Sequence, residues 1–188
     1  MPDPDRLVRL GLAFYAALLG LTLLVSLPLG RSLLFASDTA AGHGIAWGRD
    51  VGAGLAAAAL VIAASALLTG HTRLGERLAD ALAQLLGPLR VRDCLVLAAA
   101  SSIAEEALFR GLLQPLVGWV AASLLFGFAH FAPRRELLPW TGFALAAGFG
   151  LGALYEATGN LVAPVLAHAG VNAVNLWLLG RRALKPSG

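Results

Sequence analysis

The stretch SSIAEEALFRGLL, residues 101–113, governs how the whole sequence is interpreted. It has the apolar character of a buried helix, yet its centre carries Glu105, Glu106 and Arg110. A charge in the middle of a membrane helix costs roughly 2.5–3.5 kcal/mol on insertion scales, so such residues usually face the interior of a helix bundle. The stretch therefore indicates either a packed ionic cluster or a functional site inside a membrane bundle.

The composition of the chain indicates a membrane protein. Of its 188 residues, 58% are hydrophobic and 13% are charged, whereas soluble domains are roughly 45–50% apolar and about 25% charged. The mean hydropathy is +0.75. The net charge is +3, but the basic residues lie between apolar runs and form no nucleic-acid motif, so we expect no nucleic-acid partner. The single cysteine, Cys94, excludes an intrachain disulfide.

Six apolar runs approach the roughly 20 residues that a membrane-spanning helix needs. They are residues 7–30, 50–70, 92–114, 116–132, 137–157 and 161–180. The first run is longer than the core of a signal peptide, so we expect a retained helix, with a signal cleaved near LFASDTA as the alternative. Residues 71–90 carry charges on one side and leucines at helical spacing. They predict an amphipathic helix at the membrane interface, or a helix in a solvent-facing loop.

The expected fold is therefore an all-α, polytopic membrane helix bundle of about six transmembrane helices plus this amphipathic helix. The length fits a single membrane-embedded domain over residues 1–188. Residues 92–180 hold the polar motifs, and residues 1–91 supply accessory spans.

The distribution of basic residues predicts the orientation of the six spans. Eleven of the 14 fall on one side, namely Arg6, Arg9, Arg73, Arg77, Arg90, Arg92, Arg134, Arg135, Arg181, Arg182 and Lys185. Arg31 and Arg49 fall on the other side, and Arg110 lies within a span. Because cytoplasmic loops are enriched in Lys and Arg, we expect an integral protein of a bacterial-type inner membrane with both termini in the cytoplasm.

The charged residues within the third run divide into a pair and a single acid. Glu106 and Arg110 are four residues apart and share a helix face, and pairing them lowers the cost of burying both. Glu105 points about 100° away around the helix axis. It is left without this partner and is a candidate general base. The alternative is a salt-bridge cluster that only locks helix packing.

Two further stretches carry polar side chains inside apolar runs. FGFAH, residues 126–130, ends at His130, and HAGVN, residues 168–172, places His168 and Asn172 on one helix face. Two hydrogen-bond donors aimed at one point can stabilise an oxyanion. The alternatives are an interfacial histidine at position 130, and interhelical hydrogen bonds for the other two side chains.

The three motifs in this order, each in its own apolar run, resemble the CPBP family. That family groups the type II CAAX prenyl proteases with bacterial Abi proteins. The matching residues read EEALFR (105–110), FGFAH (126–130) and HAGVN (168–172), and the resemblance covers residues 92–180.

The resemblance implies an intramembrane endopeptidase. The implied site has four catalytic residues and two supporting ones, Glu105, His130, His168 and Asn172 with Glu106 and Arg110. Glu105 would activate a water with help from His130. The pair His168 and Asn172 would hold the oxyanion of the tetrahedral intermediate.

A mechanism without a metal is favoured, because Asn172 is a poor zinc ligand and forms a donor pair with His168. The alternative is a zinc-dependent protease in which Glu105, His130 and His168 hold Zn²⁺ with one open position. We expect membrane lipid and a membrane-associated or lipidated protein or peptide as partners. A non-catalytic immunity or partner-binding membrane protein is the alternative from another class. A proton-coupled carrier is disfavoured, because the sequence shows no internal repeat.

Overall fold

The computed structural model describes residues 4–184, and these form an all-helical structure, which confirms the expected fold class at this level. Within these residues there is no strand, and one isolated β-bridge joins Phe35 to Asn160. The elements in chain order are α1 (Pro4–Ser26), η1 (Leu27–Leu29), α2 (Asp38–His43), α3 (Trp47–His71), α4 (Arg73–Leu86), α5 (Val91–Glu106), η2 (Ala107–Leu113), α6 (Gln114–Val117), α7 (Trp119–Ala129), η3 (Arg135–Leu137), α8 (Leu138–Thr158) and α9 (Val162–Ala183).

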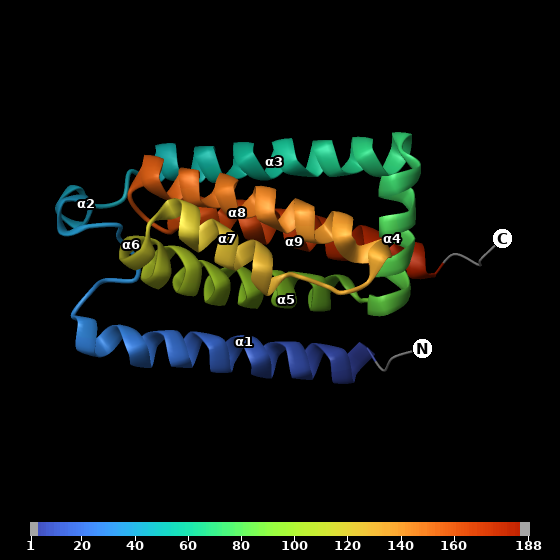
Figure 1. Ribbon diagram of the computed structural model, residues 1–188, viewed down its shortest axis with the longest axis horizontal. Coiled ribbons are helices and arrows are strands. Elements are labelled where there is room, and N and C mark those ends of the chain that lie inside the picture. Colours follow the sequence, from blue (N-terminus) through green and yellow to red (C-terminus); the bar gives the residue numbers. More distant parts are fainter. Residues whose placement is uncertain (1–3, 185–188) are drawn as a thin grey trace.

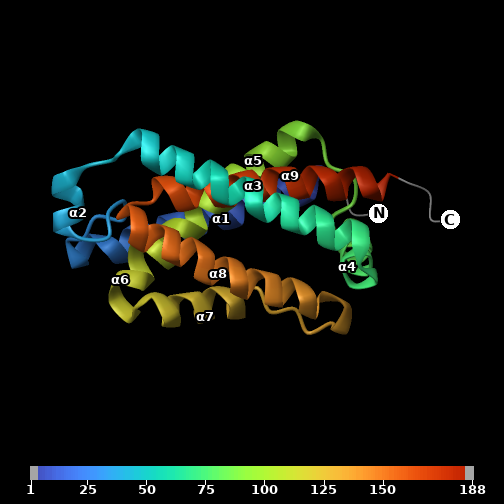
Figure 2. The same ribbon diagram turned by 90° about the horizontal axis from the view of Figure 1, so that it is seen from above.

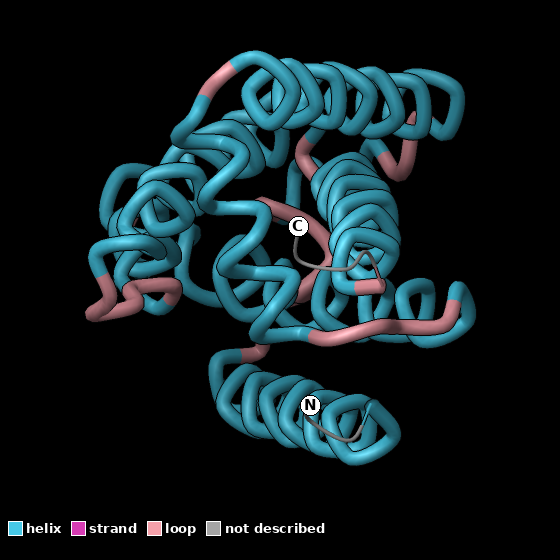
Figure 3. Tube along the Cα trace, turned by 90° about the vertical axis from the view of Figure 1, so that its right-hand side faces the viewer, coloured by secondary structure: helices cyan, strands magenta, loops and turns pink. Residues whose placement is uncertain are grey.

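The long helices run along the long axis of the molecule, and shorter elements close its two ends (Figure 1). α4 crosses one end nearly at right angles to the others, while α2 and its flanking loops lie at the opposite end. Seen from above, α7 follows only part of the length of α8 (Figure 2). The end-on view shows α1 at the edge of the bundle (Figure 3), where it packs against α5 and η2.

Within residues 4–184, four helical segments are long and apolar enough to cross a membrane. They are Asp5–Leu29, Trp47–His71, Arg135–Thr158 and Val162–Ala183. Two of the six predicted spans are not among them. Residues 92–114 include five charged side chains, and residues 116–132 are divided at Gly118 into the end of α6 and the 11-residue α7. The described helices therefore support a membrane protein without confirming six crossings.

The outward faces of α1 and α3 carry large apolar side chains. Leu10, Phe14 and Leu24 of α1 are each at least 60% exposed, and Leu60 of α3 is 72% exposed. An apolar surface of this extent is rare on soluble monomers. It is the surface expected where helices face lipid tails.

The contact between α3 and α9 depends on Gly54. A Cβ added at this position would lie 2.7 Å from the carbonyl oxygen of Ala163 and 3.0 Å from the Cβ of Leu166. The two backbones approach closely because Gly54 has no side chain. Gly52, two residues earlier on the same helix, has nothing within 4 Å of its hypothetical Cβ.

The predicted amphipathic helix is confirmed as a helix, α4. Its N-terminus is capped by Thr72, whose side chain accepts a hydrogen bond from the backbone N–H of Gly75. Its buried face presents Ala79 and Ala83, and Arg182 of α9 binds Asp80 with a 2.5 Å N–O distance. The Arg182 guanidinium lowers the pKa of the Asp80 carboxyl below its ordinary value. The place of α4 at a membrane surface remains a prediction.

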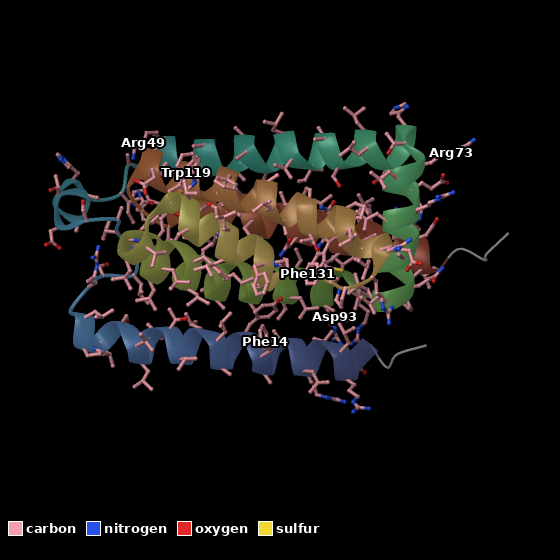
Figure 4. All side chains as sticks on the ribbon, in the orientation of Figure 1. Phe14, Arg49, Arg73, Asp93, Trp119 and Phe131 are labelled. Atoms are coloured by element: carbon pink, nitrogen blue, oxygen red, sulfur yellow. The ribbon has the colours of Figure 1, made fainter. Side chains whose placement is uncertain are left out.

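The described elements that carry most of the basic residues lie at one end of the molecule, and their orientation relative to a membrane stays a prediction. The start of α1, α4, the loop after α7 and the end of α9 lie at one end, and the chain from α1 to α3 turns at the other (Figure 1). Figure 4 shows Arg73 and Arg49 at these opposite ends. Lys185 lies outside the described residues.

The substitution Gly54→Ala should lower the thermal unfolding midpoint in detergent, because the added methyl group overpacks the α3–α9 contact at a cost of about 1–3 kcal/mol. The matched control Gly52→Ala meets no neighbour and should leave the midpoint unchanged or raise it slightly, since alanine is favoured over glycine in helices. Equal effects of the two substitutions would show that the two helices do not pack at Gly54.

Candidate active site

Glu105 and Glu106 lie where the helix changes type. α5 ends at Glu106, and the chain continues as the π-helix η2 before α6. π-helical turns are rare and occur frequently at functional sites. Gly111 lies in this turn, where a Cβ would be 2.5 Å from the carbonyl oxygen of Leu33. The chain between η1 and α2 therefore packs directly on the π-helical turn.

The turn at Gly118 brings His130 to the same depth as Glu105. Glu105 lies 13 residues before Gly118 and His130 lies 12 residues after it, so the two arms of this hairpin are nearly equal in length. Gly118 has a φ of +85°, a conformation that glycine adopts readily. α7 ends at Ala129, part of the way along α8, so His130 does not lie at the far end of a full-length span.

Glu106 is the most tightly held carboxylate of the site. Its side chain is fully buried, and its Oε1 accepts hydrogen bonds from Arg110 Nη1 at 3.1 Å and from His168 Nδ1 at 2.7 Å. Arg110 also donates from Nη2 to the carbonyl oxygen of Gly148 at 2.9 Å, and its guanidinium lies 4.5 Å from the ring centroid of Phe126. The predicted Glu106–Arg110 pair is confirmed as a contact, and His168 is an additional partner.

Glu105 faces the two histidines with an oxygen that is otherwise free. Its Oε2 lies 3.5 Å from His130 Nε2 and 4.0 Å from His168 Nε2. These distances exceed a good hydrogen bond. Among the described residues this buried oxygen has no hydrogen-bond partner. Glu105 is 7% exposed, so its carboxylate is enclosed by the bundle but a small part of the residue still reaches the surface.

The protonation of both imidazoles follows from their Nδ1 contacts. His130 Nδ1 lies 2.8 Å from the carbonyl oxygen of Phe126, and a carbonyl can only accept, so His130 donates from Nδ1. His168 Nδ1 likewise donates to the carboxylate of Glu106. In the neutral form of either ring, Nε2 therefore carries the lone pair that points toward Glu105.

Asn172 lies one helical turn beyond His168 along α9. Its Nδ2 donates to the Oγ of Ser101 at 3.0 Å, and Ser101 is one turn before Glu105 on α5. This bond uses one of the two N–H groups of the amide and leaves the second available. The structure thus brings Glu105, His130 and His168 close together. Asn172 is linked to the same helix as Glu105 by its hydrogen bond to Ser101.

Several contacts of the site carry no signal in the sequence. His168 contacts Glu106 across 62 positions, which no helical spacing predicts. Phe126 supports the site twice, through its carbonyl on His130 and its ring beside Arg110. In the sequence it is the first residue of FGFAH, and nothing there indicates either contact. Tyr15 of α1 also interacts with Glu105, from a span that carries no motif.

The fit to zinc can be judged from the side chains themselves. Glu105, His130 and His168 face one another, but among residues 4–184 no group of three His, Cys, Asp or Glu side chains is arranged to hold a metal ion. Both Nδ1–H groups bond to protein acceptors, as they also do in metal-ligating histidines, and both Nε2 atoms face Glu105. The metal-free mechanism and the zinc-dependent alternative therefore both stay predictions.

Comparison with known proteins confirms the family resemblance. Residues 88–174 match the family described as type II CAAX prenyl endopeptidase Rce1-like. The matched segment is just under half of the chain, and it contains all the candidate site residues, Glu105, Glu106, Arg110, His130, His168 and Asn172.

One curated relative matches part of the chain. Uncharacterized protein YpbD of Bacillus subtilis (strain 168) is 47% identical over 75 residues, which are 39% of this chain and 38% of that protein. The match therefore spans well under half of the relative. No solved structure matches the chain significantly.

Replacing each glutamate separately should distinguish their structural roles. Glu106→Gln removes the charge that neutralises Arg110 and should lower the free energy of unfolding by up to about 3–5 kcal/mol, the cost of an uncompensated buried charge. Glu105→Gln leaves this ion pair intact and should cause no loss of stability. Thermal unfolding of the purified variants in detergent measures both, and a larger loss in Glu105→Gln would contradict the assignment.

Proposed function

We propose that this chain, whose residues 88–174 match the type II CAAX prenyl endopeptidase Rce1-like family, is an intramembrane endopeptidase. It would hydrolyse a peptide bond of a membrane-associated or lipidated protein or peptide. The observation that supports this best is the buried Glu105 Oε2, which has two imidazole Nε2 atoms within 4.0 Å and no hydrogen bond of its own among the described residues.

The geometry suits a water molecule bound between Glu105 and His130. Glu105 Oε2 and His130 Nε2 are 3.5 Å apart, so a water oxygen beside them can lie about 2.8 Å from both atoms. Glu105 takes a proton from this water as general base while the water oxygen attacks the scissile carbonyl carbon. His130 orients the water through its Nε2 lone pair, because its Nδ1–H is bound to Phe126.

The negative charge that forms on the carbonyl oxygen needs donors on the opposite side. His168 supplies one from Nε2 when its ring is protonated, and the Glu106 carboxylate on Nδ1 stabilises that imidazolium. Asn172 supplies a second from the N–H that Ser101 does not use. When the C–N bond breaks, Glu105 returns its proton to the leaving amine. The second proton of the water stays on the new carboxyl group until it passes to the amine, so the products are a carboxylate and an ammonium group.

We propose six membrane crossings for this enzyme, in a bacterial-type inner membrane with both termini cytoplasmic. The helix from Val91 to Val117 is continuous through η2 and exceeds the roughly 20 residues that a crossing needs. α7 and the loop after it form the return pass. Irregular backbone at this depth is tolerated where protein covers it. The elements that carry most of the arginines lie at the proposed cytoplasmic end (Figure 1).

The protease is tested by comparing cells that produce either the wild-type chain or Glu105→Gln as their only copy. Membrane proteomics with N-terminal labelling should detect at least one new N-terminus in the wild type that is lost in Glu105→Gln, and its uncut precursor should accumulate. Loss of the general base should reduce the cleavage rate on the order of 10²–10⁴-fold. The control Glu136→Gln alters an exposed glutamate outside the site and should cleave as the wild type does.

Two outcomes would contradict this proposal. Identical N-terminal profiles in wild type and Glu105→Gln would favour a non-catalytic partner-binding protein. Activity of the purified enzyme that is lost on chelation and restored by Zn²⁺ would replace the metal-free mechanism with the zinc-dependent one.

A further inference from the structure

His130 is the one histidine of the site that does not lie within a continuous helix. α7 ends at the preceding residue, His130 has φ −97° and ψ 11°, and the chain then continues as an irregular loop toward η3. The last carbonyl groups of a helix have no partner within it. Such groups at membrane depth must be satisfied by other parts of the protein. The position of His130 therefore depends on what holds this loop.

Thr141, in the first turn of α8, makes that connection. Its hydroxyl donates to the carbonyl oxygen of His130 at 3.1 Å and accepts from the backbone N–H of Ala132 at 3.4 Å. One side chain thus bonds the backbone on both sides of Phe131. The neighbouring Trp140 packs its ring edge-on to the His130 imidazole, with 5.4 Å between ring centroids and 69° between ring planes.

The opposite side of the imidazole is also occupied. The ring of Phe126 lies 4.4 Å from that of His130, and the Phe126 carbonyl holds Nδ1. Within α7 alone, these contacts would fix the ring relative to its own helix. The contacts from Trp140 and Thr141 tie the ring and the backbone that follows it to the start of α8.

We propose that Thr141 is a positioning residue for the hydrolytic reaction: by bonding the backbone of the loop after α7, it holds His130 Nε2 opposite Glu105. The role rests on the proposed protease activity. Thr141 does not touch the reacting atoms, and it acts through His130 alone.

The test compares Thr141→Val, which keeps the shape and removes the hydroxyl, with Thr141→Ser, which restores it. An internally quenched peptide ending in a farnesylated CAAX sequence serves as substrate for the purified enzymes. Thr141→Val should lower kcat on the order of tenfold with little change in KM, as expected for one lost hydrogen bond and an unpaired carbonyl. Thr141→Ser should recover most of the loss.

The control is Thr22→Val. Thr22 is buried on α1, and its hydroxyl donates to the Leu18 carbonyl within its own helix. It should leave kcat unchanged. If Thr141→Val has a wild-type kcat, or if Thr141→Ser is as impaired as Thr141→Val, the positioning role is wrong.

A second measurement does not need activity. Diethylpyrocarbonate modifies free imidazole nitrogens, and peptide mass spectrometry reports the rate at each histidine. Thr141→Val should raise the rate at His130 several-fold relative to the exposed His71, while the rate at His168, held by Glu106, stays constant. An unchanged modification rate at His130 would contradict the proposal that Thr141 holds this residue in place. If the membrane proteomics detects no cleavage by the wild-type chain, the protease proposal fails and the hydrolytic role of Thr141 fails with it, while the modification rate still shows whether Thr141 holds the loop after α7.

Discussion

A charge buried among apolar helices must be neutralised, and the Glu106 carboxylate is where this chain meets that requirement. Its Oε1 accepts from Arg110 on the same helix and from His168 on α9. Arg110 in turn binds the Gly148 carbonyl of α8. These contacts connect α5 and η2 to α8 and α9. Leaving either charge alone would cost several kcal/mol.

The neutralised pair leaves the neighbouring carboxylate available. Glu105 is turned away from Arg110 and faces the imidazoles of His130 and His168. Two adjacent acids therefore have different tasks, which follow from their positions around one helix. The link from Glu106 to His168 Nδ1 also couples the structural pair to the proposed oxyanion donor, because the carboxylate fixes which nitrogen of the ring carries the proton.

Local spacing allowed part of this arrangement to be predicted from the sequence. Four residues separate Glu106 from Arg110, and their contact is confirmed at 3.1 Å. The same helical spacing predicts that Glu105, which is turned about 100° around the axis from Glu106, does not pair with Arg110. The all-helical fold is confirmed as well, because long apolar runs in lipid can satisfy their backbone only as helices or closed barrels.

The remaining features depend on long-range packing that no local pattern encodes. Straight spans would separate Glu105 from His130, and the two meet because α7 ends early and Gly118 reverses the chain. The end of α7 cannot be recognised in the sequence, because residues 116–132 are apolar on both sides of Gly118 and up to the end of the helix. Thr141 could not be identified either, because its partner is the backbone of a loop whose path the sequence does not reveal.

The central claim is that Glu105 activates water and does not itself attack the substrate. A single turnover in H₂¹⁸O tests this directly, with mass spectrometry of both the product and the protein. General-base catalysis predicts ¹⁸O in the new C-terminal carboxylate of the first product and none in Glu105. A first product without ¹⁸O, together with ¹⁸O in the Glu105 carboxylate, would contradict the claim, because that pattern requires a covalent acyl intermediate on the glutamate.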